Sequence, residues 1–144
     1  MTNLDIIFDP LPSEALTRFV TDNLVGFNMA RTGHSDWHPV GFYLKSPRGE
    51  WLGGLTGYIW GGWLHVTFLW ISETLRHQQY GTQLMDAAEA LARERGATAV
   101  TLETFSFQAP DFYAKRGYQV FGRLDGYPPG HSKLFLRKDL TEPT

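Results

Sequence analysis

The stretch from Leu64 to Gly96 constrains the fold most, because an apolar segment is followed there by a polar turn and a helical pattern. Leu64–Ile71 is almost wholly apolar and rich in β-branched and aromatic residues, which is typical of a buried strand. Arg76–Gly81 is polar and ends in glycine, and Thr82–Arg95 has apolar residues at helical spacing. The first turn of a helix has unpaired N–H groups and a partial positive charge, so this order predicts a phosphate-binding turn.

Further elements are predicted on both sides of this stretch. We expect a short strand at Asp5–Phe8, a helix from Ser13 to about Arg31, strands at Val40–Leu44, Trp51–Trp60, Thr98–Phe105, Tyr118–Arg123 and Lys133–Arg137, and a short helix at Gln108–Arg116. The strands on either side of the Thr82 helix form a βαβ unit and should be parallel. The sequence therefore predicts a single α+β domain over residues 1–144. Its central sheet should be mostly antiparallel, with one parallel βαβ crossover and helices on both faces.

Composition excludes several classes of protein. The formal net charge of −2 argues against a nucleic-acid partner. The absence of cysteine excludes disulfides, thiolate metal sites and a cysteine nucleophile. No apolar run approaches the ~18 residues of a membrane span, and the first residues lack a signal-peptide pattern. We therefore expect a cytoplasmic protein with no membrane partner and no metal.

Two short motifs point to a family. In RHQQYG, the residues Arg76, Gln79 and Gly81 stand at the three defined positions of a signature whose second position is usually glycine. FYAKRGY, which contains Tyr113, is similar to a late helix-turn-strand segment of the same family, and Ser106 stands where that family often has asparagine. With these motifs in this order of elements, the chain resembles the GNAT superfamily of acetyl-CoA-dependent N-acetyltransferases, within it a bacterial subgroup of small single-domain enzymes.

The resemblance implies acetyl-CoA as the cofactor and assigns residues to it. The pyrophosphate would be held by backbone N–H groups of the turn, and the pantetheine arm would lie along the end of the central strand. An N–H near Leu69 or Trp70 would polarise the thioester carbonyl, and Tyr113 would protonate the departing thiolate. The cofactor set is Leu69, Trp70, Ile71, Arg76, His77, Gln78, Gln79, Tyr80, Gly81, Thr82 and Ser106.

A base must also accept a proton from the attacking amine, and three residues are candidates. Glu103 lies in an otherwise uncharged strand, Glu73 follows the central strand, and His65 lies near its hairpin end. Water is the alternative. The acceptor pocket is predicted from Asn28, Asp36, Trp37, His38, Trp60 and Trp63, because tryptophans near a carboxylate suit an amine. The same tryptophans could instead pack a homodimer interface.

The function expected from these residues is transfer of an acetyl group from acetyl-CoA to a primary amine, by direct attack in a ternary complex. Without cysteine, a thioester intermediate on the enzyme is excluded. A small-molecule acceptor is favoured because the chain has no added recognition domain. A peptide or protein acceptor is an alternative. A non-catalytic acyl-CoA-binding sensor is another, motivated by the departures at Gln79 and Ser106.

Overall fold

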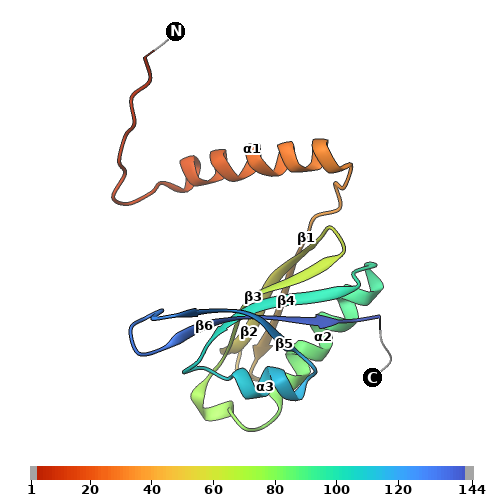
Figure 1. Ribbon diagram of the computed structural model, residues 1–144. Helices are drawn as coiled ribbons and strands as arrows, with labels where there is room; N and C mark the ends of the chain where they lie inside the picture. Colours follow the sequence, from red (N-terminus) through yellow and green to blue (C-terminus); the bar gives the residue numbers. More distant parts are fainter. Residues whose placement is uncertain (1–2, 142–144) are drawn as a thin grey trace. The chain divides into compact units, whose positions relative to one another are not determined.

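The computed structural model describes residues 3–141 of the chain (Figure 1). These residues fall into two compact units, and the boundary between the units lies after Ser35. The single domain expected over residues 1–144 stays a prediction.

The first unit contains one helix, α1 (Glu14–Thr32). Ser13 caps its start, where Oγ accepts a hydrogen bond from the backbone N–H of Leu16 at 3.1 Å. Gly33 ends it in the left-handed region, with φ of 74°, as a helix-ending glycine commonly does. The prediction of a strand at Asp5–Phe8 is wrong, because residues 3–13 contain no strand. A strand needs a partner edge, and no described strand of the sheet pairs with this segment.

The second unit is built on a six-stranded sheet. Its strands are β1 (His38–Lys45), β2 (Trp51–Trp60), β3 (Trp63–Ile71), β4 (Ala99–Phe105), β5 (Gln119–Asp125) and β6 (Ser132–Asp139). They lie in the order β1-β2-β3-β4-β6-β5. Only the β3–β4 pair is parallel, which confirms the predicted crossover and the mostly antiparallel sheet. Between β3 and β4 come a single 3-10 turn, η1 (Glu73–Leu75), and α2 (Tyr80–Glu94); α3 (Pro110–Lys115) follows β4.

The core of this unit lies between the sheet and its two helices. Leu55, Leu64 and Leu102 from the strands and Met85 from α2 are at most 1% exposed. Tyr113 of α3 belongs to the same buried cluster, so α2 and α3 cover one face of the sheet (Figure 1). Within residues 36–141 no helix covers the other face, which we call the second face. The prediction of helices on both faces is therefore not decided by this unit.

The parallel strands β3 and β4 pair over only part of their length. Register partners run from Trp63 with Ala99 to Val66 with Leu102. Beyond that point β3 continues beside β2, and β4 continues beside β6. The two strands therefore diverge, and we call the opening between them the fork.

A β-bulge in β3 accompanies the fork. In the β2–β3 register, Thr56 pairs with Phe68 but Gly57 pairs with Val66, so Thr67 has no partner in β2. Gly57 is required for this close approach, because a Cβ there would lie 2.1 Å from the carbonyl oxygen of His65. The bulge bends β3 at the position where its pairing with β4 ends.

Candidate functional site

The turn that enters α2 has an unusual backbone. The Nε of Arg76 donates a hydrogen bond to the carbonyl oxygen of Ile71 at 3.1 Å, which ties the turn to the end of β3. His77 and Gln79 have φ of 65° and 68°, in the left-handed region that residues other than glycine seldom adopt. Glycine, the usual residue of the signature at position 79, adopts this left-handed conformation readily. Gln79 adopts the same conformation although it carries a side chain.

The first turn of α2 is open to an anion. Gln79 is the N-cap but provides no side-chain hydrogen bond, and the first turn contains no acidic residue. By helix geometry the leading N–H groups, including those of Tyr80 and Gly81, have no intrahelical partner. Gly81 lets the turn pack closely, because a Cβ there would lie 3.3 Å from both Ile71 Cδ1 and Phe112 Cζ. The geometry suits a phosphate group held by backbone donors.

A hollow runs beside α2 from the same turn. Its volume is about 690 Å³, and it is lined by Thr82, Asp86, Glu89, Arg93, Phe112, Lys115, Arg116 and Lys138. Glu89 is one of the lining residues and is only 3% exposed. It accepts hydrogen bonds from Lys138 Nζ at 2.7 Å, the Tyr118 hydroxyl at 2.8 Å and the Arg116 guanidinium at 3.1 Å. Sequence reasoning missed this cluster, because only long-range packing brings β6 and the segment after α3 to the carboxylate.

Tyr113 lies on α3 and is 8% exposed. Its ring contacts those of Phe112 and Tyr118, with centroids 5.0 and 5.7 Å away. Burial raises the pKa of Tyr113 to about 12, against the opposing effect of nearby Arg116. The phenol is therefore neutral at pH 7 and retains a proton to donate.

Ser106 has a structural partner. Its Oγ accepts a hydrogen bond from the N–H of Ser132 at 2.9 Å, and its own N–H donates to the Ser132 carbonyl at 2.8 Å. These bonds join the end of β4 to the start of β6. The side chain predicted for the cofactor site is therefore already engaged within the fold.

Leu69, Trp70 and Ile71 lie on the part of β3 beyond the fork. On one side they pair with β2, from Leu55 with Leu69 to Gly53 with Ile71. On the other side the pairing with β4 has ended. The carbonyl oxygen of Ile71 already accepts from Arg76 Nε, whereas the backbone groups of Leu69 have no partner in β4. Pairing of a ligand with this segment as an added strand stays a prediction.

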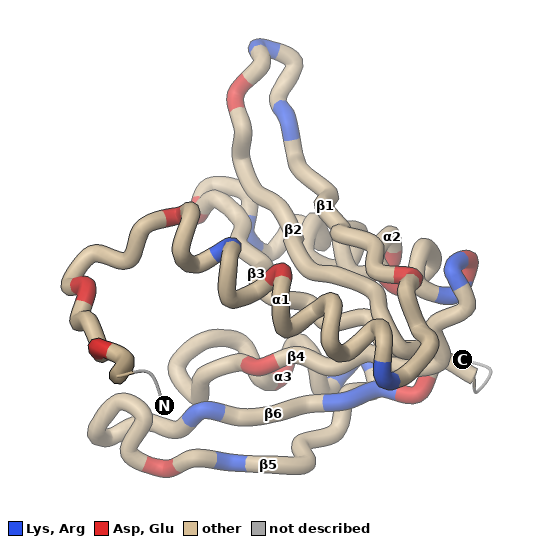
Figure 2. The backbone as a smooth tube through the Cα atoms, turned by 90° about the horizontal axis from the view of Figure 1, so that it is seen from above, with Lys and Arg blue, Asp and Glu red and all other residues tan. Residues whose placement is uncertain are grey.

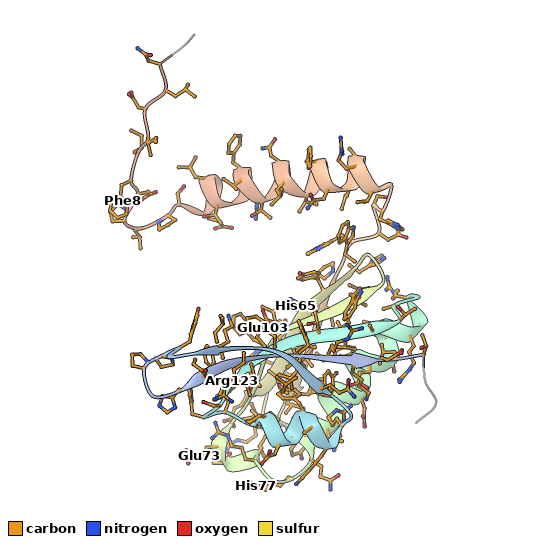
Figure 3. The ribbon with its side chains drawn as sticks, viewed as in Figure 1. Phe8, His65, Glu73, His77, Glu103 and Arg123 are labelled. Carbon is orange, nitrogen blue, oxygen red and sulfur yellow. The ribbon has the colours of Figure 1, made fainter. Side chains whose placement is uncertain are left out.

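The structure brings two of the three candidate bases together. His65 Nε2 and Glu103 Oε2 are 2.8 Å apart across β3 and β4, although 38 residues separate them in the chain. Figure 3 shows these two side chains meeting, whereas Glu73 lies with His77 in the segment after β3. Glu73 is exposed on η1. Only His65 and Glu103 therefore form a pair at the fork.

One predicted pocket residue, Trp37, joins this pair through a residue that sequence reasoning missed. Trp37 stacks on Tyr58, with centroids 5.8 Å apart and planes at 21°. Tyr58 in turn contacts the ring of His65 at 5.2 Å. The available signal was the two-residue turn Gly61-Gly62, which sets the β2–β3 register and so places Tyr58 opposite His65. A continuous row runs from Trp37 to Glu103.

The other predicted pocket residues are dispersed. Trp60 and Trp63 pair with each other at the β2–β3 turn, and the Trp63 ring lies 5.2 Å from the Arg137 guanidinium. His38 Nδ1 lies 3.1 Å from Arg95 NH1. Asp36 is exposed, and Asn28 belongs to α1 in the first unit.

Among residues 3–141, no group of three or more acidic or histidine side chains could hold a metal ion. None of the described helices is both long and apolar enough to cross a membrane.

Comparisons with known proteins complete the description. A model of the acetyltransferase (GNAT) family matches residues 6–118. The chain is 41% identical over 99 residues to a blasticidin-S acetyltransferase of Streptomyces morookaense, covering 68% of this chain and 73% of that protein. It is 31% identical over 133 residues to acetyltransferase Atu2258 of Agrobacterium fabrum strain C58, and the match covers 92% of this chain and 96% of that protein. A crystal structure of an acetyltransferase from Bacillus cereus ATCC 14579 matches with a TM-score of 0.78 at 33% identity, covering 94% of this chain and 97% of that one.

Proposed function

Because the chain belongs to the acetyltransferase (GNAT) family, as its motifs predicted, we propose that it transfers the acetyl group of acetyl-CoA to a primary amine of a small molecule. The observation that carries this proposal is the fork between β3 and β4, which leads to the open first turn of α2. An extended thiol arm and an anionic pyrophosphate, joined in one molecule, match these two features.

Acetyl-CoA would occupy both features at once. The pantetheine arm would add to the free side of β3 at Leu69, Trp70 and Ile71, with backbone amides as partners. The pyrophosphate would lie at the turn from Arg76 to Thr82, where backbone N–H groups and the helix dipole favour an anion. Gln79 would contribute through its backbone, since its side chain provides no cap to the helix.

The chemistry would be direct attack by the amine on the thioester. A backbone N–H near Leu69 or Trp70 would stabilise the developing oxyanion. The thiolate would leave with the electron pair of the C–S bond, and Tyr113 would protonate it. Tyr113 has a pKa of about 12, so it carries its proton at neutral pH and can donate it to the departing thiolate.

A small-molecule acceptor is supported by a relative and by the second face. The relative that is 41% identical is named for acetylation of blasticidin-S, which is a small molecule. The aromatic row of Trp37 and Tyr58 ends at the Glu103 carboxylate, an arrangement that suits a cationic amine. A peptide acceptor and a non-catalytic sensor are outcomes that the following test distinguishes.

The test measures thiol release from acetyl-CoA with a panel of small amines and with peptides bearing free amines. We expect Tyr113→Phe to lower kcat by about 100-fold, the usual size of a general-acid contribution, with acetyl-CoA affinity within about threefold of wild type. Tyr118→Phe is the matched control, because it also removes a buried hydroxyl but one that binds Glu89.

Three outcomes would change the proposal. Equal kcat for wild type and Tyr113→Phe removes Tyr113 as the acid. Turnover of peptides alone moves the acceptor to that class. Tight acetyl-CoA binding without thiol release for any amine favours the sensor.

A further inference from the structure

His65 and Glu103 occupy the apex of the fork. The last register pair of β3 and β4 is Val66 with Leu102, and both side chains are buried on the helix-covered face. His65 comes directly before Val66, and Glu103 directly after Leu102. Because side chains alternate along strands, both point to the second face, where β4 has just separated from β3.

The hydrogen-bond inventory determines which nitrogen of His65 carries the proton. Nε2 lies 2.8 Å from Glu103 Oε2, whereas Nδ1 is buried and has no hydrogen-bond partner among the described residues. An N–H at Nδ1 would be a buried donor without an acceptor, which is unfavourable. The geometry therefore favours the proton on Nε2, from which it is donated to Glu103. His65 is thus a donor, and its lone pair is inaccessible.

Packing fixes this donor in place. Tyr58 contacts the imidazole at 5.2 Å with the planes at 58°, and Trp37 stacks on the far side of Tyr58. The His65 side chain is 22% exposed, against 34% for Glu103. A ligand on the second face therefore reaches the carboxylate rather than the imidazole.

Within residues 36–141 the carboxylate of Glu103 has only one side-chain partner, and that partner is His65. Basic residues lie nearby on β6, as Figure 2 shows, but they are engaged elsewhere. Lys133 Nζ lies over the ring of Tyr127 at 5.1 Å, and Arg137 lies over Trp63. Neither forms an ion pair with Glu103 in the described residues. One oxygen, Oε1, therefore remains for a ligand.

We propose that Glu103 is the base that accepts the proton of the acceptor amine, and that His65 is a positioning residue that acts through it. This inference rests on the proposed acetyl transfer. The N–H proton passes to Glu103 Oε1 as the C–N bond forms. The C–S bond then breaks with its electron pair on sulfur, which Tyr113 protonates. The base and the acid thus lie on opposite faces of the sheet, with the fork between them.

The first experiment is kinetic, with thiol release from acetyl-CoA to the best amine of the panel as the readout. We expect Glu103→Ala to lower kcat by about 100-fold without raising the KM for acetyl-CoA, and added formate to restore at least about tenfold. His65→Leu should lower kcat about tenfold. His65→Gln keeps an N–H donor, so its kcat should be close to that of the wild type. Glu94→Gln, an exposed carboxylate on α2, controls for loss of charge.

The double variant separates positioning from direct participation. If His65 acts through Glu103, then His65→Leu changes kcat less than about twofold in the Glu103→Ala background. Independent losses that multiply would overturn the positioning role. Full activity of Glu103→Ala, or a loss that formate does not restore, would overturn the assignment of the base.

A second readout does not need turnover. In ¹⁵N-labelled protein, long-range ¹H–¹⁵N correlation spectra should show the Nε2–H tautomer of His65, and Glu103→Ala should change it. An Nδ1–H or doubly protonated ring in the wild type would overturn the inference. Absence of thiol release by the wild type would overturn the proposed function and the base together, whereas release by the wild type and by Glu103→Ala at equal rates overturns the inference alone.

Discussion

Replacing Gln79 by glycine should stabilise this protein, although glycine is destabilising in the interior of a helix. Gln79 has φ of 68°, and the left-handed conformation costs a residue with a Cβ about 1–2 kcal/mol. Glycine removes that cost but loses about 0.5–1 kcal/mol, because the unfolded chain becomes more flexible. The Gln79 side chain makes no capping bond that would be lost. We expect a net gain of about 0.5–1 kcal/mol in the free energy of unfolding.

The neighbouring residue provides a matched control of opposite sign. Gln78 does not have a positive φ, and its Nε2 donates to the Thr74 carbonyl at 3.2 Å. Gln78→Gly therefore loses this hydrogen bond and gains backbone freedom in the unfolded state, a destabilisation of about 1–2 kcal/mol. Urea unfolding of the two variants beside wild type measures both changes.

Calorimetric titration with CoA completes this test. If the turn binds phosphate through its backbone, Gln79→Gly should keep CoA affinity within about threefold of wild type. A Gln79→Gly variant that is less stable than wild type, or as unstable as Gln78→Gly, would refute the argument that conformation limits this position. A loss of CoA affinity without a loss of stability would show that the glutamine side chain itself binds the cofactor.

Two further predictions concern the buried cluster beside α2. Glu89→Ala should lower the free energy of unfolding by about 3–5 kcal/mol, because Arg116 and Lys138, whose side chains are each only 12% exposed, would lose this partner. Exposed Glu94→Ala should change it by less than about 0.5 kcal/mol in the same urea titration. Stability should also fall above about pH 10, the pKa of an exposed tyrosine. Burial raises the pKa of Tyr113 to about 12, and burial together with Glu89 raises that of Tyr118 well above its usual value. The folded state therefore keeps protons that the unfolded chain releases, at a cost of about 1.4 kcal/mol per pH unit for each tyrosine until its folded pKa is passed. For Tyr118→Phe, the free energy of unfolding measured from pH 9 to 11.5 should decline less steeply than for wild type. Identical slopes for the two proteins would contradict the raised pKa of Tyr118.

Local patterns were sufficient for most elements. β2 spans Trp51–Trp60 as predicted, and Ser13 caps α1, because alternation and capping depend on residues adjacent in the chain. The strand, polar turn and helix after Leu64 are likewise local and were predicted in this order, whereas anion binding at α2 stays a prediction. The strand predicted at Asp5–Phe8 is the exception, because a mostly apolar tetrapeptide forms a strand only where it can pair with the edge of another strand.

Tertiary structure alone decided which of the candidate residues lie together. His65, Glu103 and Tyr58 come from three strands, and only the sheet register brings them together. The fork also depends on where two strands stop pairing, which alternation along either strand does not encode. The sequence by itself determined the family and most of the elements, because these depend on short-range patterns. The contact between His65 and Glu103 required long-range pairing, because hydrogen bonds across a sheet join residues that the chain keeps far apart.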